Sequence, residues 1–263
     1  MALSLSGRGF AVSVADRNAA RAQALGRRFQ CSTRRSGPFA LVLLAVPDPS
    51  IPGAARALAR EGLAPGLAVH LSGATPVEAL APLADAGWRT AKMHPVYAFP
   101  PGPAPLPRGV TFGVRASSPA ALREVRGLVR RLGGKPIPIR GGMDAAWHLA
   151  CVLAGNVLFA QLQAAGTIMD DASSERGGAV DALAPLVSSS LHNAIEGGLS
   201  RGLTGPVARG DAASIEENLS ILLERYPEFS VLYAAAATLL IRSLPPGRRA
   251  ALRRRLKRGG ILL

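Results

Sequence analysis

The chain has 263 residues, of which 48% are hydrophobic, and carries a formal net charge of +14. This length allows a sizeable core and favours two domains or one large one. The longest apolar runs, Phe39–Val46 and Val231–Ile241, are shorter than the roughly 20 residues of a membrane-spanning helix, so we expect no membrane span. The start shows no secretory signal, and the two cysteines lack metal-ligand spacing. These features indicate a cytoplasmic protein.

The positive charge lies almost wholly in the N-terminal half. Residues 1–140 hold 19 basic and 6 acidic side chains, whereas residues 141–263 hold 12 and 11. A basic half suits an anionic cofactor, but arginines spread over a solvated surface give the same count. The basic tail at 242–258 lacks interleaved aromatic residues and any recognisable module, so we do not expect nucleic acid as a partner.

Short β-rich runs alternate with helical stretches from Phe10 to about Arg140, which is typical of βαβ units and a parallel sheet. The predicted strands are Ala11–Ala15, Phe39–Val46, Leu67–Leu71, Thr90–Met93, Val110–Arg115 and Pro136–Ile139. The predicted helices are Ala19–Phe29, Pro52–Glu61, Pro76–Ala86 and Pro119–Leu132. Because the Phe39–Val46 run does not alternate, we expect a central strand that is covered on both faces.

The sequence composition changes at Gly141-Gly142. Long stretches rich in alanine and leucine follow, and they predict an all-helical second domain. We expect helices at Asp144–Met169 and Ala179–Leu199, then a break, then a helix capped by Asp211. The predicted domains are therefore 1–141 and 142–263. The long apolar helices favour a homodimer formed through the second domain.

The N-terminal glycines do not form a dinucleotide-binding loop. A G-x-G-x-x-G loop must follow a strand and open a helix, because helix N-terminal amides bind the pyrophosphate. Gly7-Arg8-Gly9 instead precedes a predicted strand, so we interpret it as a helix end and a turn. The fold class that we predict is α/β: an N-terminally truncated Rossmann-type parallel sheet followed by an all-α domain, with the missing strand and loop about ten residues upstream.

Polar residues at the predicted strand ends are candidates for binding, because ligands of open α/β sheets bind beyond the carboxyl ends of the strands. At the end of the second strand of a dinucleotide fold, a carboxylate binds the ribose 2′-hydroxyl and an arginine pairs with a 2′-phosphate. Asp16 and Arg17 offer both groups, so the sequence leaves NAD and NADP open, with a preference for NADP. The alternative is that Asp16 caps the following helix.

Ser72 and His94 end two successive strands and are expected to reach one cleft. There His94 could take a proton from a substrate hydroxyl, or give one to a carbonyl, during hydride transfer. The alternative is a histidine that caps a loop before proline. We interpret His70 as structural, and a chain with four histidines and no ligand-like spacing predicts no metal site.

The predicted helix Asp144–Met169 is apolar nearly all round, as a buried helix would be. Its polar residues fall on one stripe at helical spacing, namely His148, Asn156, Gln163 and Asp170. Such a stripe faces either a cleft or a partner helix. For Gln163, the simpler interpretation is that its side chain forms a hydrogen bond between helices. Further on, Arg209 could bind a substrate carboxylate, although a plain helix break explains most of its neighbourhood.

Five collinear motifs carry a family resemblance: VLLAVPD (Val42–Asp48), HLSGA (His70–Ala74), HPVYAF (His94–Phe99), WHLACVLAGN (Trp147–Asn156) and LTGPVARGD (Leu203–Asp211). The chain resembles the family that joins a Rossmann-like domain to the domain of unknown function 2520. That family is similar in plan to pyrroline-carboxylate reductases, ketopantoate reductases and prephenate dehydrogenases.

The resemblance implies an NAD(P)-dependent oxidoreductase acting on a small carbonyl or hydroxyl substrate that it does not identify. It implies cofactor contacts at Val46, Pro47, Asp48, Ser72 and Gly73, although Pro-Asp-Pro also forms an ordinary turn. It further implies that His94 is the acid or base and that Ser72, His148 and Asn156 orient the substrate. The alternative is a non-catalytic ligand-binding or dimeric scaffold protein, because a chain without the glycine loop is expected to bind NADP or NAD weakly or not at all.

Overall fold

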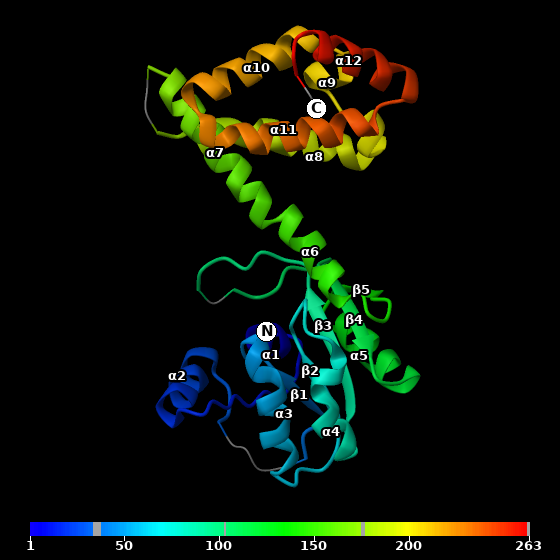
Figure 1. Cartoon of the computed structure of the whole chain (residues 1–263). Coiled ribbons are helices and arrows are strands. Elements are labelled where there is room, and N and C mark those ends of the chain that lie inside the picture. Colours follow the sequence, from blue (N-terminus) through cyan, green and yellow to red (C-terminus); the bar gives the residue numbers. More distant parts are fainter. Residues whose placement is uncertain (34–37, 103, 175–176, 262–263) are drawn as a thin grey trace. The chain divides into compact units, whose positions relative to one another are not determined.

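The computed structural model describes the chain apart from residues 34–37, 103, 175–176 and 262–263 (Figure 1). Its contacts divide it into two compact units, Met1–Gly155 and Asn156–Leu263. The first unit contains the sheet and the second is helical, which confirms the predicted fold class. The predicted domain boundary at 141/142 stays a prediction, although the helix that follows it groups with the first unit.

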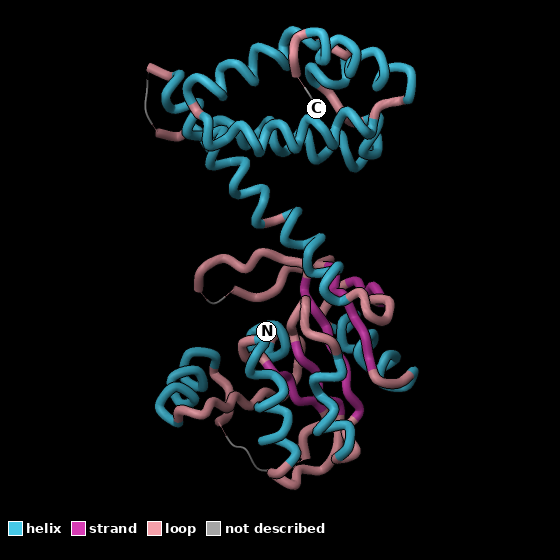
Figure 2. Tube along the Cα trace, in the orientation of Figure 1, coloured by secondary structure: helices cyan, strands magenta, loops and turns pink. Residues whose placement is uncertain are grey.

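Helices and strands alternate through most of the first unit, with the third and fourth strands following one another directly (Figure 2). Its strands are β1 (Leu41–Leu44), β2 (Leu67–His70), β3 (Arg89–Pro95), β4 (Thr111–Ala116) and β5 (Lys135–Pro138). Its α-helices are α1 (Ala2–Ser6), α2 (Ala19–Phe29), α3 (Ile51–Ala59), α4 (Ala81–Asp85), α5 (Pro119–Arg131) and α6 (Asp144–Ala154), and its short 3₁₀ helices are η1 (Asp48–Ser50) and η2 (Val77–Leu80).

The five strands form one sheet in the order β1-β2-β3-β4-β5. Neighbours are parallel except β3 and β4, which are antiparallel. The expectation of a wholly parallel sheet is therefore wrong at β4. A parallel connection needs a long crossover that is usually a helix, whereas the proline-rich link from Pro95 to Thr111 has no helix in its described residues.

The predicted first strand and the predicted central strand are both corrected by the structure. Ala11–Ala15 is not a strand, and within the described part of the chain it makes one isolated bridge, between Ser13 and Ser32. The Phe39–Val46 run shortens to β1, which lies at the edge of the sheet. Three of its four residues are only half-buried, because no strand among the described residues pairs with its outer side.

Each face of the sheet carries its own core. Alternate residues of a strand point to opposite faces, so Val69 joins the core under α5 while Ala68 joins the core under α3 and α4. Trp88 and Ile51 are buried in the second of these cores. The strands are thus packed between α3 and α4 on one face and α5 on the other, and the candidate site lies at the carboxyl ends of β1, β2 and β3.

The predicted helix ends are mostly confirmed. Asp211 caps its helix by accepting a hydrogen bond from the Ser214 amide at 3.2 Å. Gly7 ends α1, as the turn interpretation of Gly7-Arg8-Gly9 requires. The cap of α2 is Asn18, which accepts from the Arg21 amide, so the alternative that Asp16 caps this helix is wrong.

The second unit consists of α7 (Asn156–Ala172), α8 (Ala179–Arg201), α9 (Gly205–Arg209), α10 (Ala212–Arg225), α11 (Pro227–Ser243) and α12 (Pro246–Arg258). The break expected before Asp211 thus contains one short helix, α9. The core of this unit is built from α9 to α12 and includes Ile215, Ile241 and Leu252. The basic residues of α12 surround two leucines that are buried in that core.

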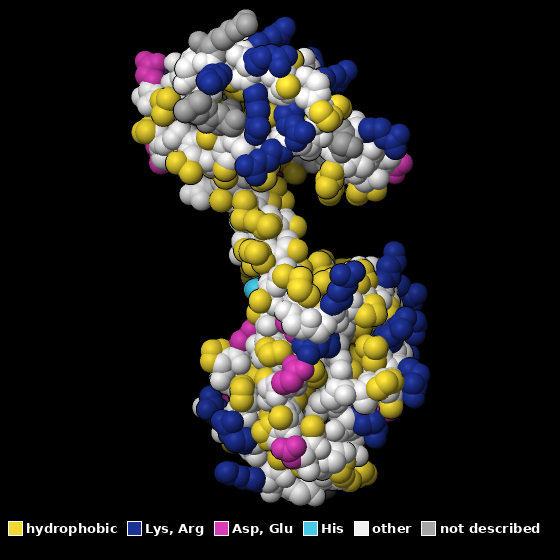
Figure 3. All heavy atoms as spheres, turned by 45° about the vertical axis from the view of Figure 1, so that its right-hand side comes forward, with side chains coloured by type: hydrophobic (Ala, Val, Ile, Leu, Met, Phe, Trp, Pro, Cys, Tyr) yellow, Lys and Arg dark blue, Asp and Glu magenta, His cyan; other side chains and the backbone are white. Residues whose placement is uncertain are grey.

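The predicted helix Asp144–Met169 is interrupted at Gly155, so α6 and α7 are separate helices. It is also not buried: Leu149, Leu153 and Phe159 are exposed, and Figure 3 shows hydrophobic side chains on the surface. By length and composition alone, Asp144–Ala172 could cross a membrane, with 11% of its most apolar window buried. The expectation of no membrane span rested on shorter apolar runs and stays a prediction.

Candidate active site

The carboxyl ends of β1, β2 and β3 lie at one edge of the sheet because these strands are parallel. Asp48 follows β1, Ser72 follows β2 and His94 lies near the end of β3. The first turns of α6 add Trp147 and His148. The structure therefore groups three of the four residues predicted to be catalytic, Ser72, His94 and His148, while their roles stay predictions.

Ser72 and Asp48 form a hydrogen-bonded pair across two strand ends. The Ser72 hydroxyl donates to Asp48 Oδ2 at 2.6 Å and accepts from the Thr75 amide at 2.9 Å. Ser72 is buried, whereas Asp48 is exposed. The hydroxyl proton is engaged by the carboxylate, so Ser72 fixes the turn that carries Gly73 and presents an oriented oxygen.

His94 is held in place by two residues of α6. Its Nδ1 accepts a hydrogen bond from the Trp147 indole at 3.2 Å, and the His148 ring meets it edge to face at 5.9 Å between centroids. Burial lowers the pKa of His94 to about 4, with His148 and Lys92 adding to the shift and Asp48 opposing it. His94 is consequently neutral at neutral pH.

Gly73 provides the space in which the two histidine rings meet. A Cβ built at this position would lie 2.7 Å from His148 Nδ1 and 2.9 Å from His94 Nε2. No side chain fits there without displacing a ring. Gly73 is therefore required at the site by its small size, and the two ring nitrogens converge on this part of the Ser72–Thr75 turn.

A buried ion-pair network lies beneath the turn. The Lys92 ammonium, which is fully buried, donates to the carbonyls of Gly73 and Thr75 at 3.0 and 2.8 Å and to Asp144 Oδ1 at 2.8 Å. All three of its protons are thus used. Burial lowers the pKa of Lys92, and the hydrogen bond to Asp144 opposes that shift.

Arg115 extends this network to a second strand and a second helix. It pairs with the other oxygen of Asp144 and with Glu78. The network therefore ties β3, β4 and η2 to the first residue of α6. Because Trp147 and His148 follow Asp144 within one turn, the network also fixes where their side chains reach the sheet.

Sequence reasoning missed Lys92, Asp144 and Trp147. The available signal was a lysine inside the apolar strand segment TAKM, because a strand covered on both faces excludes a charge that has no partner. The partner itself is 52 residues away and could not be read from spacing. His70, opposite Lys92 in the strand register, is fully buried, as its structural interpretation requires.

The remaining predicted residues lie elsewhere. Asp16 accepts from the Asn18 amide at 2.9 Å and pairs with Arg21 at 3.5 Å, while Arg17 is exposed. Val46 and Pro47 lead from β1 into η1 and are exposed.

Asn156 and Arg209 both belong to the helical unit, so the structure does not place them with His94. Arg209 lies 3.9 Å from the Asp211 carboxylate and is largely exposed.

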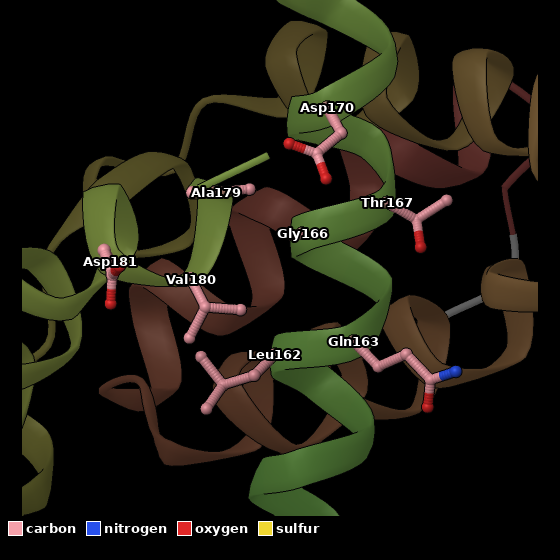
Figure 4. A pocket seen from close by; sticks show the side chains of 9 residues that line it. Leu162, Gln163, Gly166, Thr167, Asp170, Ala179, Val180 and Asp181 are labelled. Carbon is pink, nitrogen blue, oxygen red and sulfur yellow. The ribbon is translucent and has the colours of Figure 1, made fainter. Parts of the chain in front are cut away.

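The helical unit contains an open cavity of about 390 Å³ between α7 and α8 (Figure 4). It is lined by Leu162, Gln163, Gly166, Thr167 and Asp170 and by Gly178–Asp181. Leu162 and Val180 point toward one another, whereas Gln163 points away from α8. The Asp170 carboxylate accepts from the Gly177 amide at 3.2 Å. This part of the predicted polar stripe thus helps to hold the α7–α8 turn.

The strand-end residues fit one part of a dinucleotide better than another. Asp48, Ser72 and the Gly73 turn border the sheet edge where the nicotinamide end binds in such folds. The pyrophosphate needs the amides of a glycine loop between a strand and a helix, and the described residues contain no such G-x-G-x-x-G loop. The residues present fit the nicotinamide end of the cofactor and lack this anchor.

These features define an α/β protein of the Rossmann type with a helical second domain. Residues 10–95 match a Rossmann-like domain, and residues 110–239 match the domain of unknown function DUF2520. The chain therefore combines a Rossmann-like domain with a DUF2520 domain, which confirms the resemblance drawn from its motifs. A comparison with curated proteins found no match.

Solved structures share this fold at low sequence identity. A Thermotoga maritima protein is 23% identical with a TM-score of 0.72, covering 92% of this chain and 93% of that one. A Bacteroides fragilis protein provisionally assigned as an NADP oxidoreductase is 19% identical with a TM-score of 0.71, covering 91% and 92%. A pyrroline-5-carboxylate reductase from Coxiella burnetii is 14% identical with a TM-score of 0.58, covering 97% and 92%.

Proposed function

We propose that the chain is an NAD(P)-dependent oxidoreductase that acts on a small carbonyl or hydroxyl substrate. The observation that carries this proposal is the grouping of Asp48, Ser72, Gly73, His94 and His148 at the carboxyl ends of parallel strands. The fold likeness to a provisional NADP oxidoreductase and to a pyrroline-5-carboxylate reductase supports the same class of reaction.

The proposed cofactor contacts follow the sheet edge. When bound, the dinucleotide supplies a hydride to a carbon of the substrate, or accepts one from it. The backbone of Val46 and Pro47 and the Asp48–Ser72 pair border its nicotinamide end. Asp16 is already occupied by Asn18 and Arg21, whereas Arg17 is exposed, which favours an arginine contact with the 2′-phosphate of NADP over a carboxylate contact with NAD.

The substrate is proposed to lie against Gly73, where it reaches the rings of His94 and His148. Ser72, whose hydroxyl is fixed by Asp48, orients the turn and presents its oxygen to the substrate. Asn156 and Arg209 belong to the helical unit, and the substrate contacts predicted for them stay predictions, with a carboxylate as the group that Arg209 would bind.

Calorimetric titration of the full chain with NADPH and with NADH tests the proposal. We expect saturable binding of NADPH, weaker than in folds that hold the pyrophosphate on a glycine loop. Arg17→Ala should weaken NADPH binding by about tenfold, because a charged hydrogen bond contributes roughly 1.5–3 kcal/mol, and should leave NADH unchanged. Arg27→Ala, also on an exposed arginine of this segment, is the matched control. Absence of saturable binding to either dinucleotide would overturn the proposal.

The same titration distinguishes a second candidate function, a ligand-binding or dimeric scaffold without catalysis. The observation that favours it is the lack of a glycine loop in the residues that the structure describes. A stable dimer that binds neither dinucleotide and turns over no carbonyl substrate would support this alternative.

We further propose that the protein is a homodimer formed through the helical unit. Twelve large hydrophobic residues of this unit are exposed, namely Phe159, Met169, Val180, Leu186, Leu191, Ile195, Leu199, Ile221, Leu223, Val231, Leu239 and Leu240. A stable interface needs about 20–30 residues on each side, a size that these residues and their neighbours can supply. Helix α8 has three charged residues in 23, so its surface suits an equally apolar copy of itself and not a charged partner.

Light scattering after gel filtration tests this assembly. We expect twice the mass of the chain in aqueous buffer. A monomer, or a chain that stays in solution only with detergent, would contradict the dimer, and the second result would point to a membrane-bound helix at Asp144–Ala172.

A further inference from the structure

The hydrogen bond between Trp147 and His94 determines which nitrogen of His94 carries its proton. The indole Nε1 lies 3.2 Å from His94 Nδ1. An indole N–H can only donate, so Nδ1 must accept. A neutral imidazole has one N–H and one acceptor nitrogen. The N–H of neutral His94 is therefore on Nε2, the nitrogen that faces Gly73.

Three elements hold the indole at this position. Gly113 of β4 is directly opposite His94 of β3, and a Cβ at Gly113 would lie 2.5–2.7 Å from indole atoms. The indole thus occupies the space that a side chain at residue 113 would fill. Asp144, one turn earlier on α6, is tied to Lys92 and Arg115. The hydrogen bond is consequently built into the packing of β3, β4 and α6.

The surroundings keep His94 neutral over a wide pH range. The groups that face it are His148 from α6, Lys92 from its own strand and Asp48 from the segment after β1. Burial, His148 and Lys92 lower the pKa of His94 to about 4, and only Asp48 acts in the opposite direction. Protonation of Nδ1 would in addition break the bond to Trp147, because two donors would then face each other.

We propose that Trp147 is a positioning residue that fixes His94 as a neutral hydrogen-bond donor through Nε2. This inference rests on the proposed function and refines it. His94 can polarise an acceptor atom of the substrate, such as a carbonyl oxygen or an imine nitrogen, but it cannot take a proton through that nitrogen. The site therefore suits reduction of a carbon–oxygen or carbon–nitrogen double bond, in which hydride is added to carbon and solvent supplies the proton to the heteroatom.

Long-range ¹H–¹⁵N correlation spectra of the ¹⁵N-labelled chain test this assignment without cofactor or substrate. We expect the Nε2–H tautomer for His94 and a ring that stays largely unprotonated from pH 8 down to about 5. In Trp147→Phe, which has no N–H, we expect a mixture of tautomers and a pKa that moves toward the ordinary value of about 6.5. Gly113→Ala should act in the same direction by displacing the indole.

Trp88→Phe is the matched control, since Trp88 is buried in the core on α3 and α4. It should leave the His94 signals unchanged. An Nδ1–H tautomer in the unsubstituted protein, or a Trp147→Phe spectrum identical to that of the unsubstituted protein, would overturn the inference. These outcomes differ from failure of the proposed function, which would appear as absent dinucleotide binding with the Nε2–H tautomer intact.

Discussion

The two units of the chain complete their packing to different degrees. In the α/β unit, both faces of the sheet are covered, and the buried charges of Lys92 and Asp144 have partners. In the helical unit, only α9 to α12 build a core, while α8 buries just its first residue, Ala179, among its described side chains. In a single chain, the α/β unit thus has a complete core and partners for its buried charges, whereas the helical unit exposes an apolar surface.

This difference indicates where stability depends on the chain alone and where it depends on a partner. Exposed apolar patches of this extent on soluble proteins mark interaction surfaces. We therefore expect substitutions in the α/β unit to change the free energy of unfolding by an amount that does not depend on protein concentration. Substitutions on α8 should instead change the dissociation constant of the dimer.

The largest loss of stability is expected from Lys92→Met in the α/β unit. Removing one partner of a buried ion pair costs roughly 3–5 kcal/mol. Here Asp144 keeps only Arg115 as its partner among the described residues, and the carbonyls of Gly73 and Thr75 lose the donor they share. The matched control is Arg89→Met, which breaks an exposed pair with Glu124 and should cost about 0–1 kcal/mol. Urea unfolding measures both. Equal effects of the two substitutions would show that the buried network contributes no special stability.

The second effect concerns pH and His70. Burial, together with Lys92, lowers the pKa of His70 to about 4, and the Pro76 backbone, Asp48 and Asp144 oppose the shift in part. The unfolded chain therefore binds more protons than the folded one between pH 6.5 and 4, so the free energy of unfolding falls as pH falls through this window. The loss is on the order of 3 kcal/mol.

His70→Leu should remove the share of this pH dependence that His70 contributes, while His94, whose pKa is also lowered to about 4, keeps its own share. Stability at pH 7 should not fall, because neither ring nitrogen of His70 has a hydrogen bond of ordinary geometry to the described residues. Unfolding curves at a series of pH values measure it. An unchanged slope between pH 6.5 and 4 would contradict the assignment to His70.

The third effect tests the open surface of the helical unit. Ile195→Asp on α8 should weaken the dimer by about a hundredfold or more, since both copies would bury an unpaired carboxylate. Sedimentation over a range of concentrations measures the dissociation constant. Ile137→Asp on β5, another exposed isoleucine, is the control and should leave the dimer intact. If both variants dissociate alike, the interface is not specific to α8.

The smallest effect is expected at the candidate site. Gly73→Ala should cost about 1–3 kcal/mol, because its Cβ displaces the rings of His94 and His148. Gly53→Ala in α3 is the control: no atom lies within 4 Å of its Cβ, so helix propensity should stabilise the protein by roughly 0.5–1 kcal/mol. Thermal unfolding compares them. A neutral Gly73→Ala would mean that the rings adjust freely.

The sequence predicted the candidate site in part. Ser72 and His94 are predicted to lie together because they end apolar runs, and the structure brings both to one edge of the sheet, while their roles stay predictions. His148 was found from helical spacing. Trp147 and Lys92 were missed because their partners are 53 and 52 residues away, beyond the reach of any local pattern.

Local sequence patterns predict the kinds of elements and their order: an alternating α/β half, a helical half and the cap at Asp211. These follow from local periodicity and from hydrogen bonds between near neighbours. Four features became visible in the folded chain alone: β4 runs antiparallel, β1 lies at an edge, Gly155 divides a predicted helix and Trp147 holds His94. Each of these depends on which distant segments pack together, and the pattern of a single segment does not encode that choice.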